Sequence, residues 1–158
     1  MCIRDRTSAA PLCTWEEPVR DEWIDYNGHL SEPYYVLVLG HATDAVMDAV
    51  GLGPAYREET GSSLYTVEAH VRYLDQVSAG EQLEARSWVI GATGKLLWIW
   101  HELWAGAPGA QTLRATEEIL GLHVTDSRTS PFPEDVKGRI DTALTTPPEH
   151  ASRSIRVG

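Results

Sequence analysis

At residues 25–31 the chain reads Asp25-Tyr26-Asn27-Gly28-His29-Leu30-Ser31, and a nearly wholly apolar run from Pro33 to Val50 follows directly. Apolar or small side chains recur in that run at helical spacing, which predicts one long helix covered on most of its sides. Ser31 is a suitable N-cap, and Gly51 suits the position just after the helix. Because the rest of the chain is rich in strand patterns, we expect the sheet to wrap around this helix.

The hydrophobic period changes to two after a short second helix, which is expected over residues 54–59. Alternation then predicts four strands, at residues 64–73, 83–89, 96–105 and 112–124. In the first of these, Tyr65 and Tyr73 are expected on one face and Glu68 on the other. A further strand over residues 13–20 precedes the long helix and carries Pro18, which is typical of a sheet edge. A short helix over residues 134–144 is expected to end the domain. This order predicts an α+β hot-dog fold, an antiparallel sheet wrapped around one long central helix.

Composition is that of one ordinary globular domain. The 158 residues are 42% hydrophobic and 23% charged, and the formal net charge is −10 without a Lys/Arg cluster, so we expect no nucleic-acid partner. No apolar run reaches the roughly 20 residues of a membrane span, and the first ten residues lack the apolar core of a secretory signal. We therefore expect a cytoplasmic protein without membrane contact. Residues 1–12 are expected to be a disordered or foreign extension, 13–145 the domain and 146–158 a flexible tail.

The acidic turn before the long helix is the main candidate for chemistry. A helix N-terminus carries unpaired N–H groups and a partial positive charge, which favour a carbonyl oxygen or an anion. Asp25 and His29 lie a few residues before that terminus, although such residues often serve only to satisfy the backbone of a turn. Glu68 has two interpretations as well. It is either a second active-site acid or counter-charge, or a solvated carboxylate paired with His70 or Arg72.

The wider sequence is similar to a known family over about residues 14–140. The similarity lies mainly in four runs, Trp23 to Tyr35, Leu64 to Glu68, Tyr73 to Val77 and Ala115 to Glu117. These runs resemble the 4-hydroxybenzoyl-CoA thioesterase branch of the hot-dog superfamily and, more closely, the betainyl-CoA thioesterases of carnitine breakdown. The chain departs from that group at residues 31–33, where Ser-Glu-Pro replaces an Asn-Asp-Ala-like run.

This resemblance implies hydrolysis of a small acyl-CoA thioester, with betainyl-CoA as the best specific substrate. It implies a homodimer or homotetramer with its sites between subunits. Asp25 is then the catalytic carboxylate, acting either as a base on water or as a nucleophile. Asn27 would orient water or the carboxylate, and His29 would do the same or hold the loop. Backbone amides from Leu30 to Glu32 would polarise the carbonyl oxygen.

A trimethylammonium acyl group would bind well against aromatic faces, although strand aromatics often serve packing instead. The candidate substrate-binding residues, which combine aromatics with the helix entry, are Trp23, Tyr26, Leu30, Ser31, Tyr34, Tyr65 and Trp98. Candidate contacts for the CoA phosphates are Lys95, Arg128 and Arg139. The sequence has neither a His/Cys metal spacing nor a Gly-rich phosphate loop. We therefore expect no metal and no cofactor, and CoA enters as part of the substrate.

Three alternatives stay open on the same fold. One is a thioesterase for another short-chain or aromatic acyl-CoA, and a second is a non-catalytic module that binds acyl-CoA. The third is a dehydratase, for which His41 and Asp44 on the long helix would be the histidine and the acid. That i, i+3 spacing is common by chance.

Overall fold

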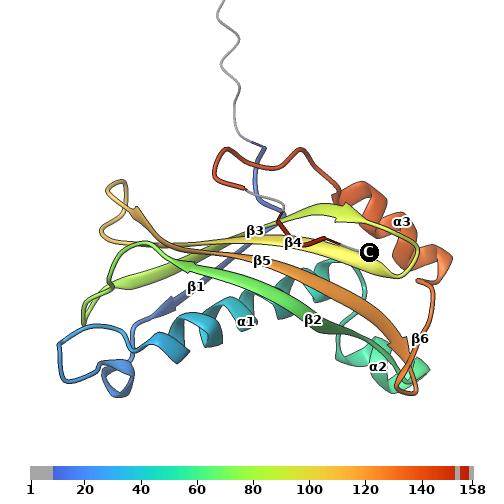
Figure 1. Cartoon of the computed structure of the whole chain (residues 1–158), viewed down its shortest axis with the longest axis horizontal. Helices are drawn as coiled ribbons and strands as arrows, with labels where there is room; N and C mark the ends of the chain where they lie inside the picture. Colours follow the sequence, from blue (N-terminus) through green and yellow to red (C-terminus); the bar gives the residue numbers. More distant parts are fainter. Residues whose placement is uncertain (1–8, 152–153, 157–158) are drawn as a thin grey trace, which may run out of the picture.

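The computed structural model describes residues 9–151 and 154–156. Six antiparallel strands curve over the long helix α1 (Glu32–Ala49), and Figure 1 shows this helix lying along one face of the sheet. The strand order is β1-β3-β4-β5-β2, with β6 paired to β5. The α+β hot-dog prediction is confirmed. In chain order the other elements are β1 (Cys13–Pro18), η1 (Asp21–Trp23), α2 (Pro54–Thr60), β2 (Ser62–Tyr73), β3 (Gln82–Ala92), β4 (Leu96–Ala105), β5 (Thr112–Thr125), β6 (Arg128–Thr129) and α3 (Glu134–Ala143).

The two faces of the sheet pack against different parts of the chain. The inner face packs on α1, whose Val38, Leu39 and Val46 are fully buried. The outer face carries a second apolar cluster that includes Trp88 and Trp98. Separate packing on both faces explains why β3, β4 and β5 are buried almost throughout.

The chain segments before β1 and after α3 cover the outer face, on the side away from α1 (Figure 1). The indole N–H of Trp88 donates to the carbonyl of Ala9 at 2.8 Å. Near the C-terminus, the N–H of Ile155 donates to Glu118 Oε1 at 2.7 Å, and the Ile155 side chain is buried. The packed unit therefore extends beyond the predicted limits of 13–145 on both sides. The first eight residues of the predicted extension lie outside the described part of the chain.

A β-bulge in β2 changes the face on which its side chains lie. The register with β5 shifts at Val67, and one inserted residue reverses the alternation beyond it. Tyr65 lies opposite Leu122, which packs with the outer cluster, whereas Tyr73 lies opposite Ala115 of the inner core. The prediction that the two tyrosines share a face is therefore wrong.

Helix α1 begins and ends close to the predicted residues. Ser31 is its N-cap, without a side-chain capping bond, and Gly51 follows it with a φ of 81°. Val36 and Leu37 are 44% and 42% exposed, so one side of the helix is uncovered within a single chain, contrary to the expectation from its apolar composition. In the described ranges no single helix is long and apolar enough to cross a membrane; only α1 and α2 together meet those criteria, with a 61° bend between them.

Candidate active site

The loop between η1 and α1 folds into a closed turn that begins at Asp25. The N–H of Asp25 donates to the carbonyl of His29 at 2.9 Å, and the N–H of Gly28 donates to the carbonyl of Asp25 at 3.0 Å. Gly28 has a φ of 80°, a conformation that glycine adopts without steric cost. These backbone hydrogen bonds close the turn directly before the helix.

The carboxylate of Asp25 is half-buried and caps its own turn. The N–H groups of Asn27 and His29 donate to Asp25 Oδ1 at 2.9 and 3.3 Å. Within residues 9–151 and 154–156, these are the hydrogen bonds that the carboxylate accepts, so Oδ2 keeps its lone pairs for water or a substrate. The structural and the catalytic interpretations of Asp25 are therefore compatible, because each uses a different oxygen.

The backbone amides at the helix entry are only partly available to a substrate. The N–H of Leu30 donates to the carbonyl of Val77 at 2.8 Å, and the N–H of Ser31 donates to the carbonyl of Trp23 at 2.9 Å. The expectation that these two amides bind a carbonyl oxygen is therefore wrong. The N–H of Glu32 is the first of the helix and has no acceptor in the described part of the chain. It is the amide that remains for an oxyanion.

Asp25 lines a cavity of about 510 Å³ between the start of α1 and the end of β2. Three lining residues carry carboxylates, Asp25, Glu32 and Asp75, and two are aromatic, Tyr35 and Tyr73. The two tyrosine rings meet edge to face, with their centroids 5.3 Å apart. The cavity is therefore acidic and aromatic, directly beside the candidate catalytic carboxylate.

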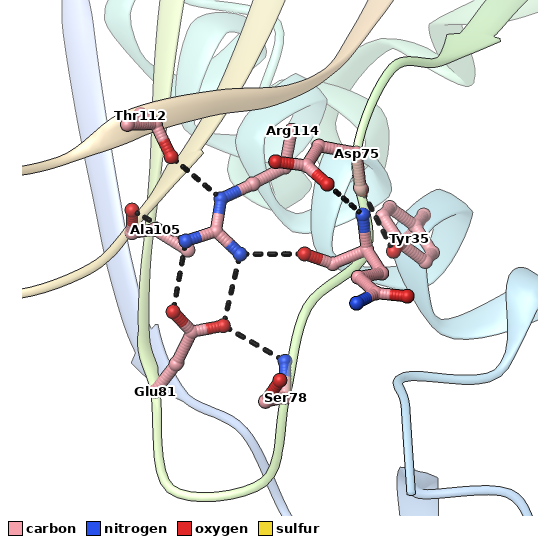
Figure 2. A network of polar contacts seen from close by, with 8 residues as sticks. Tyr35, Asp75, Ser78, Glu81, Ala105, Thr112 and Arg114 are labelled. Atoms are coloured by element: carbon pink, nitrogen blue, oxygen red, sulfur yellow. Dashed lines mark hydrogen bonds and ion pairs between the residues drawn. The ribbon is translucent and has the colours of Figure 1, made fainter. Parts of the chain in front are cut away.

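Arg114 holds the loop after β2, whose Asp75 and Gln76 line this cavity, and Figure 2 shows its contacts. Its guanidinium donates two hydrogen bonds to Glu81, at 2.8 and 2.9 Å, and one to the carbonyl of Gln76 at 2.6 Å. Hydrogen bonding to Arg114 also holds the pKa of Glu81 below its usual value. Asp75 Oδ1 accepts the N–H of Gln76, and the Asp75 carbonyl accepts the hydroxyl of Tyr35. This bidentate ion pair fixes the loop before any substrate binds.

Cavity residues from β2 and the loop after it were absent from the predicted site. Tyr73, Asp75 and Gln76 line the cavity, because residues of the same loop pair with the turn that carries Asp25. His29 forms a β-bridge with Ser78. The run from Tyr73 to Val77 was visible in the sequence as part of the family resemblance, and this was the available signal for the second half of the site.

Three predicted site residues lie on the other side of the sheet from this cavity. Glu68, Tyr65 and Trp98 lie on the outer face of the sheet, whereas the cavity borders the inner face. Glu68 is exposed, and its Oε1 lies 3.0 Å from His70 Nε2. This is the solvated pairing with His70 that was one of the two interpretations of Glu68 from the sequence. Trp98 is buried in the outer cluster.

The other predicted aromatics are near the loop but have different surroundings. Trp23 is buried and stacks on Tyr34 with ring centroids 5.4 Å apart, while the guanidinium of Arg20 lies 5.5 Å from the Trp23 ring. Tyr26 is 98% exposed at the tip of the turn. The faces of Trp23 are thus already occupied, and the Tyr26 side chain is open to solvent rather than part of a pocket among the described residues.

The candidate cations for CoA lie at the opposite end of the sheet from Asp25. Lys95 is in the β3–β4 turn, Arg128 is on β6 and Arg139 is on α3, and all three are exposed. In a single chain they therefore do not approach the cavity. Across the described residues, no cluster of three or more His, Cys, Asp or Glu side chains is placed to hold a metal ion.

Residues 19–140 match the model of a family described as the thioesterase-like superfamily. The chain belongs to this family. It is a thioester hydrolase with the hot-dog fold. The family match spans all elements from the end of β1 into α3, including both halves of the cavity.

Individual relatives agree with this assignment. The chain is 41% identical over 132 residues to a betainyl-CoA thioesterase of Pseudomonas aeruginosa, covering 82% of each sequence. It is 36% identical to an L-carnitine dehydrogenase/betainyl-CoA thioesterase of Agrobacterium fabrum, covering 92% of this chain and 31% of that one. Among solved structures, a putative thioesterase of Pseudomonas putida superposes with a TM-score of 0.76 at 30% identity, over 95% of this chain and 99% of that one.

Proposed function

We propose that the protein hydrolyses betainyl-CoA to betaine and CoA. The observation that carries the proposal is the cavity beside Asp25, in which two carboxylates and two tyrosines accompany the candidate catalytic group. A cationic acyl group is attracted by such a lining, whereas an anionic one is repelled. The 41% identity to the Pseudomonas aeruginosa protein supports the same substrate. We also propose that this reaction takes place in the cytoplasm.

Asp25 acts on the thioester in one of two ways under this proposal. As a base, it removes a proton from water, whose oxygen attacks the thioester carbonyl. As a nucleophile, it attacks the carbonyl itself, and water then hydrolyses the resulting anhydride. In both routes the carbon–sulfur bond breaks, the acyl group leaves as a carboxylate and the CoA sulfur takes up a proton. The N–H of Glu32, at the positive end of α1, stabilises the oxyanion that forms.

We also propose that two copies pair through β2 and the uncovered side of α1. β2 is twelve residues long and lies at the sheet edge, and a long unpaired edge favours pairing with another chain. Val67 of β2 and Leu74 directly after it are exposed, and Val36 and Leu37 of α1 are exposed as well. In antiparallel pairing, the cavity would lie beside the opposite end of the partner's sheet, the end that carries the candidate CoA-binding cations.

A panel of acyl-CoA thioesters tests the substrate. We expect kcat/KM for betainyl-CoA to exceed that for butyryl-CoA and 4-hydroxybenzoyl-CoA by at least about tenfold, because the acidic lining favours a cation. Release of free CoA thiol measures each rate. A preference for a neutral thioester would assign the protein to another acyl group, and binding without thiol release would identify a non-catalytic module.

The oligomeric state tests the proposed pairing. Leu37→Glu introduces a charge on the uncovered side of α1, and we expect it to convert a dimer into a monomer, because the charge would be buried on association. Leu12→Glu is the matched control, since Leu12 is 37% exposed on another part of the surface. Light scattering coupled to size exclusion measures both masses. A Leu37→Glu variant that stays dimeric would show that the interface lies elsewhere.

A further inference from the structure

Glu117 is a buried carboxylate without a cationic partner in the described part of the chain. It lies on β5, is 4% exposed, and its Oε2 has no hydrogen-bond partner. Its neighbours across the ladder are His101 on β4 and Val71 on β2. His101 contacts Thr43 of α1, so Glu117 lies on the inner face, the same face that borders the cavity. A buried and unpaired carboxylate is costly, and a protein keeps one mainly where it has a use.

The histidine that pairs with Glu117 across the ladder does not neutralise it. The ring of His101 is fully buried, and both of its nitrogens are engaged, Nδ1 with Ser87 Oγ at 2.7 Å and Nε2 with Thr43 Oγ1 at 2.8 Å. Burial lowers the pKa of His101 to about 3, so the ring is neutral at physiological pH. His101 therefore supplies no positive charge to Glu117.

Tyr73 connects Glu117 to the cavity. Tyr73 pairs with Ala115, which is two residues before Glu117 on the same face of β5, so the two side chains are diagonal neighbours. The pKa of Tyr73 is raised by burial first, then by Glu32, and also by the charge of Glu117. Tyr73 in turn meets Tyr35 edge to face, and both rings line the cavity with Asp25. Glu117 therefore lies behind one aromatic wall of the site.

A quaternary ammonium group has no N–H donors and is recognised by aromatic faces and nearby negative charge. In a betainyl thioester a single methylene separates the ammonium nitrogen from the reacting carbonyl, so the cation must lie close to Asp25. We propose that Tyr35 and Tyr73, which line the cavity, form an acyl sub-pocket, and that the charge of Glu117 behind Tyr73 makes it select a quaternary ammonium group over a neutral group of the same shape. This inference depends on the proposed function, because it assigns residues to its substrate.

The tryptophans of the chain are less suited to this role. Trp88, Trp98 and Trp100 form the outer cluster, on the side of the sheet away from the cavity. Trp104 is already covered by the guanidinium of Arg86 at 4.4 Å. The tyrosine pair is thus the aromatic surface that adjoins both Asp25 and a buried carboxylate.

The test uses betainyl-CoA and its carbon isostere, 3,3-dimethylbutyryl-CoA, in which a tert-butyl group replaces trimethylammonium. The measured quantity is the ratio of kcat/KM for the two thioesters. We expect the wild type to favour betainyl-CoA and Glu117→Gln to lower this ratio at least about tenfold, with the rate on the isostere maintained. Glu118→Gln is the matched control, because Glu118 is the next residue and equally buried, but faces the outer side. Its ratio is expected to stay within twofold of the wild type.

Two variants of Tyr73 keep the test decisive if Glu117→Gln folds poorly. Tyr73→Leu removes the ring and is expected to lower the ratio several-fold, whereas Tyr73→Phe keeps the ring and most of the ratio. A wild type that prefers the isostere, or cleaves neither thioester, overturns the proposed function. A wild type that prefers betainyl-CoA, with the ratio unchanged in Glu117→Gln and Tyr73→Leu, overturns this inference and leaves the proposed function standing.

Discussion

Asp25→Asn is expected to lower kcat by about 10²–10⁴-fold while leaving the fold intact, which is the range for loss of a positioned acid or base. The amide oxygen of asparagine can still accept the N–H groups of Asn27 and His29 that now end on Oδ1. The turn is therefore preserved, and the variant loses only the negative charge and the basicity of the carboxylate. Thiol release from betainyl-CoA measures the loss, and thermal unfolding checks the fold.

Asp21→Asn is the matched control for this experiment. Asp21 lies four residues upstream, is exposed and changes the net charge by the same amount when replaced. Its activity is expected to equal that of the wild type. If Asp25→Asn retained activity within twofold, the carboxylate would serve only the turn, and the catalytic group would have to be sought elsewhere in the cavity.

The fold could be predicted because its main determinants are local in the sequence. The apolar residues of the run that becomes α1 recur at helical spacing, and β4, from Leu96 to Ala105, is a run of mostly apolar and aromatic residues of strand length. The edge position of β1 followed from Pro18 and is confirmed, since β1 is the first strand in the order of the sheet, beside β3. Each of these inferences needs only propensity and period, which are properties of short segments.

The faces of β2 could not be predicted from period alone. A bulge at Val67 inserts one residue, and nothing in the alternating sequence marks it. The error placed Tyr65 and Tyr73 on one face, so the period gave no reason to choose Tyr73 over Tyr65 for substrate binding. Register depends on the hydrogen-bonded partner strand, and the partner of β2 is β5, more than forty residues further along the chain.

The residues of the candidate site also form two groups, those that could be predicted from the sequence and those that could not. Asp25, Asn27 and His29 were found because they occupy one short turn, whose chemistry is visible in consecutive residues. Glu117 and Asp75 were not selected as site residues, because topology brings them to the site, one through the inner face of β5 and the other through the loop that Arg114 holds. Contacts between distant segments depend on the pairing of the whole sheet. A catalytic turn can therefore be predicted from consecutive residues, whereas the substrate pocket beside it cannot.

Removing the charge of Glu117 is expected to stabilise the protein at high pH. Burial raises the pKa of Glu117 from 4.5 to about 7 in the folded state. Between these values the folded state holds a proton that the unfolded state has released, so the stability linked to Glu117 is fully present below pH 4.5 and is lost as the pH rises through 7. The size of this shift corresponds to about 3 kcal/mol.

Glu117→Gln is neutral at every pH, so it should escape this loss. We expect its free energy of unfolding, relative to the wild type, to rise by about 3 kcal/mol between pH 4.5 and pH 8. His101 acts in the opposite sense, because its lowered pKa removes stability as the pH falls below 6.5, but it is present in both proteins and cancels in the difference. Urea unfolding at several pH values measures this difference.

A difference that does not change with pH would mean that Glu117 is solvated or paired. Glu117 would then lack the unneutralised charge that a cationic acyl group is proposed to meet. A difference that does rise would identify a residue whose ionised form destabilises the free enzyme, as expected of a group kept for its ligand.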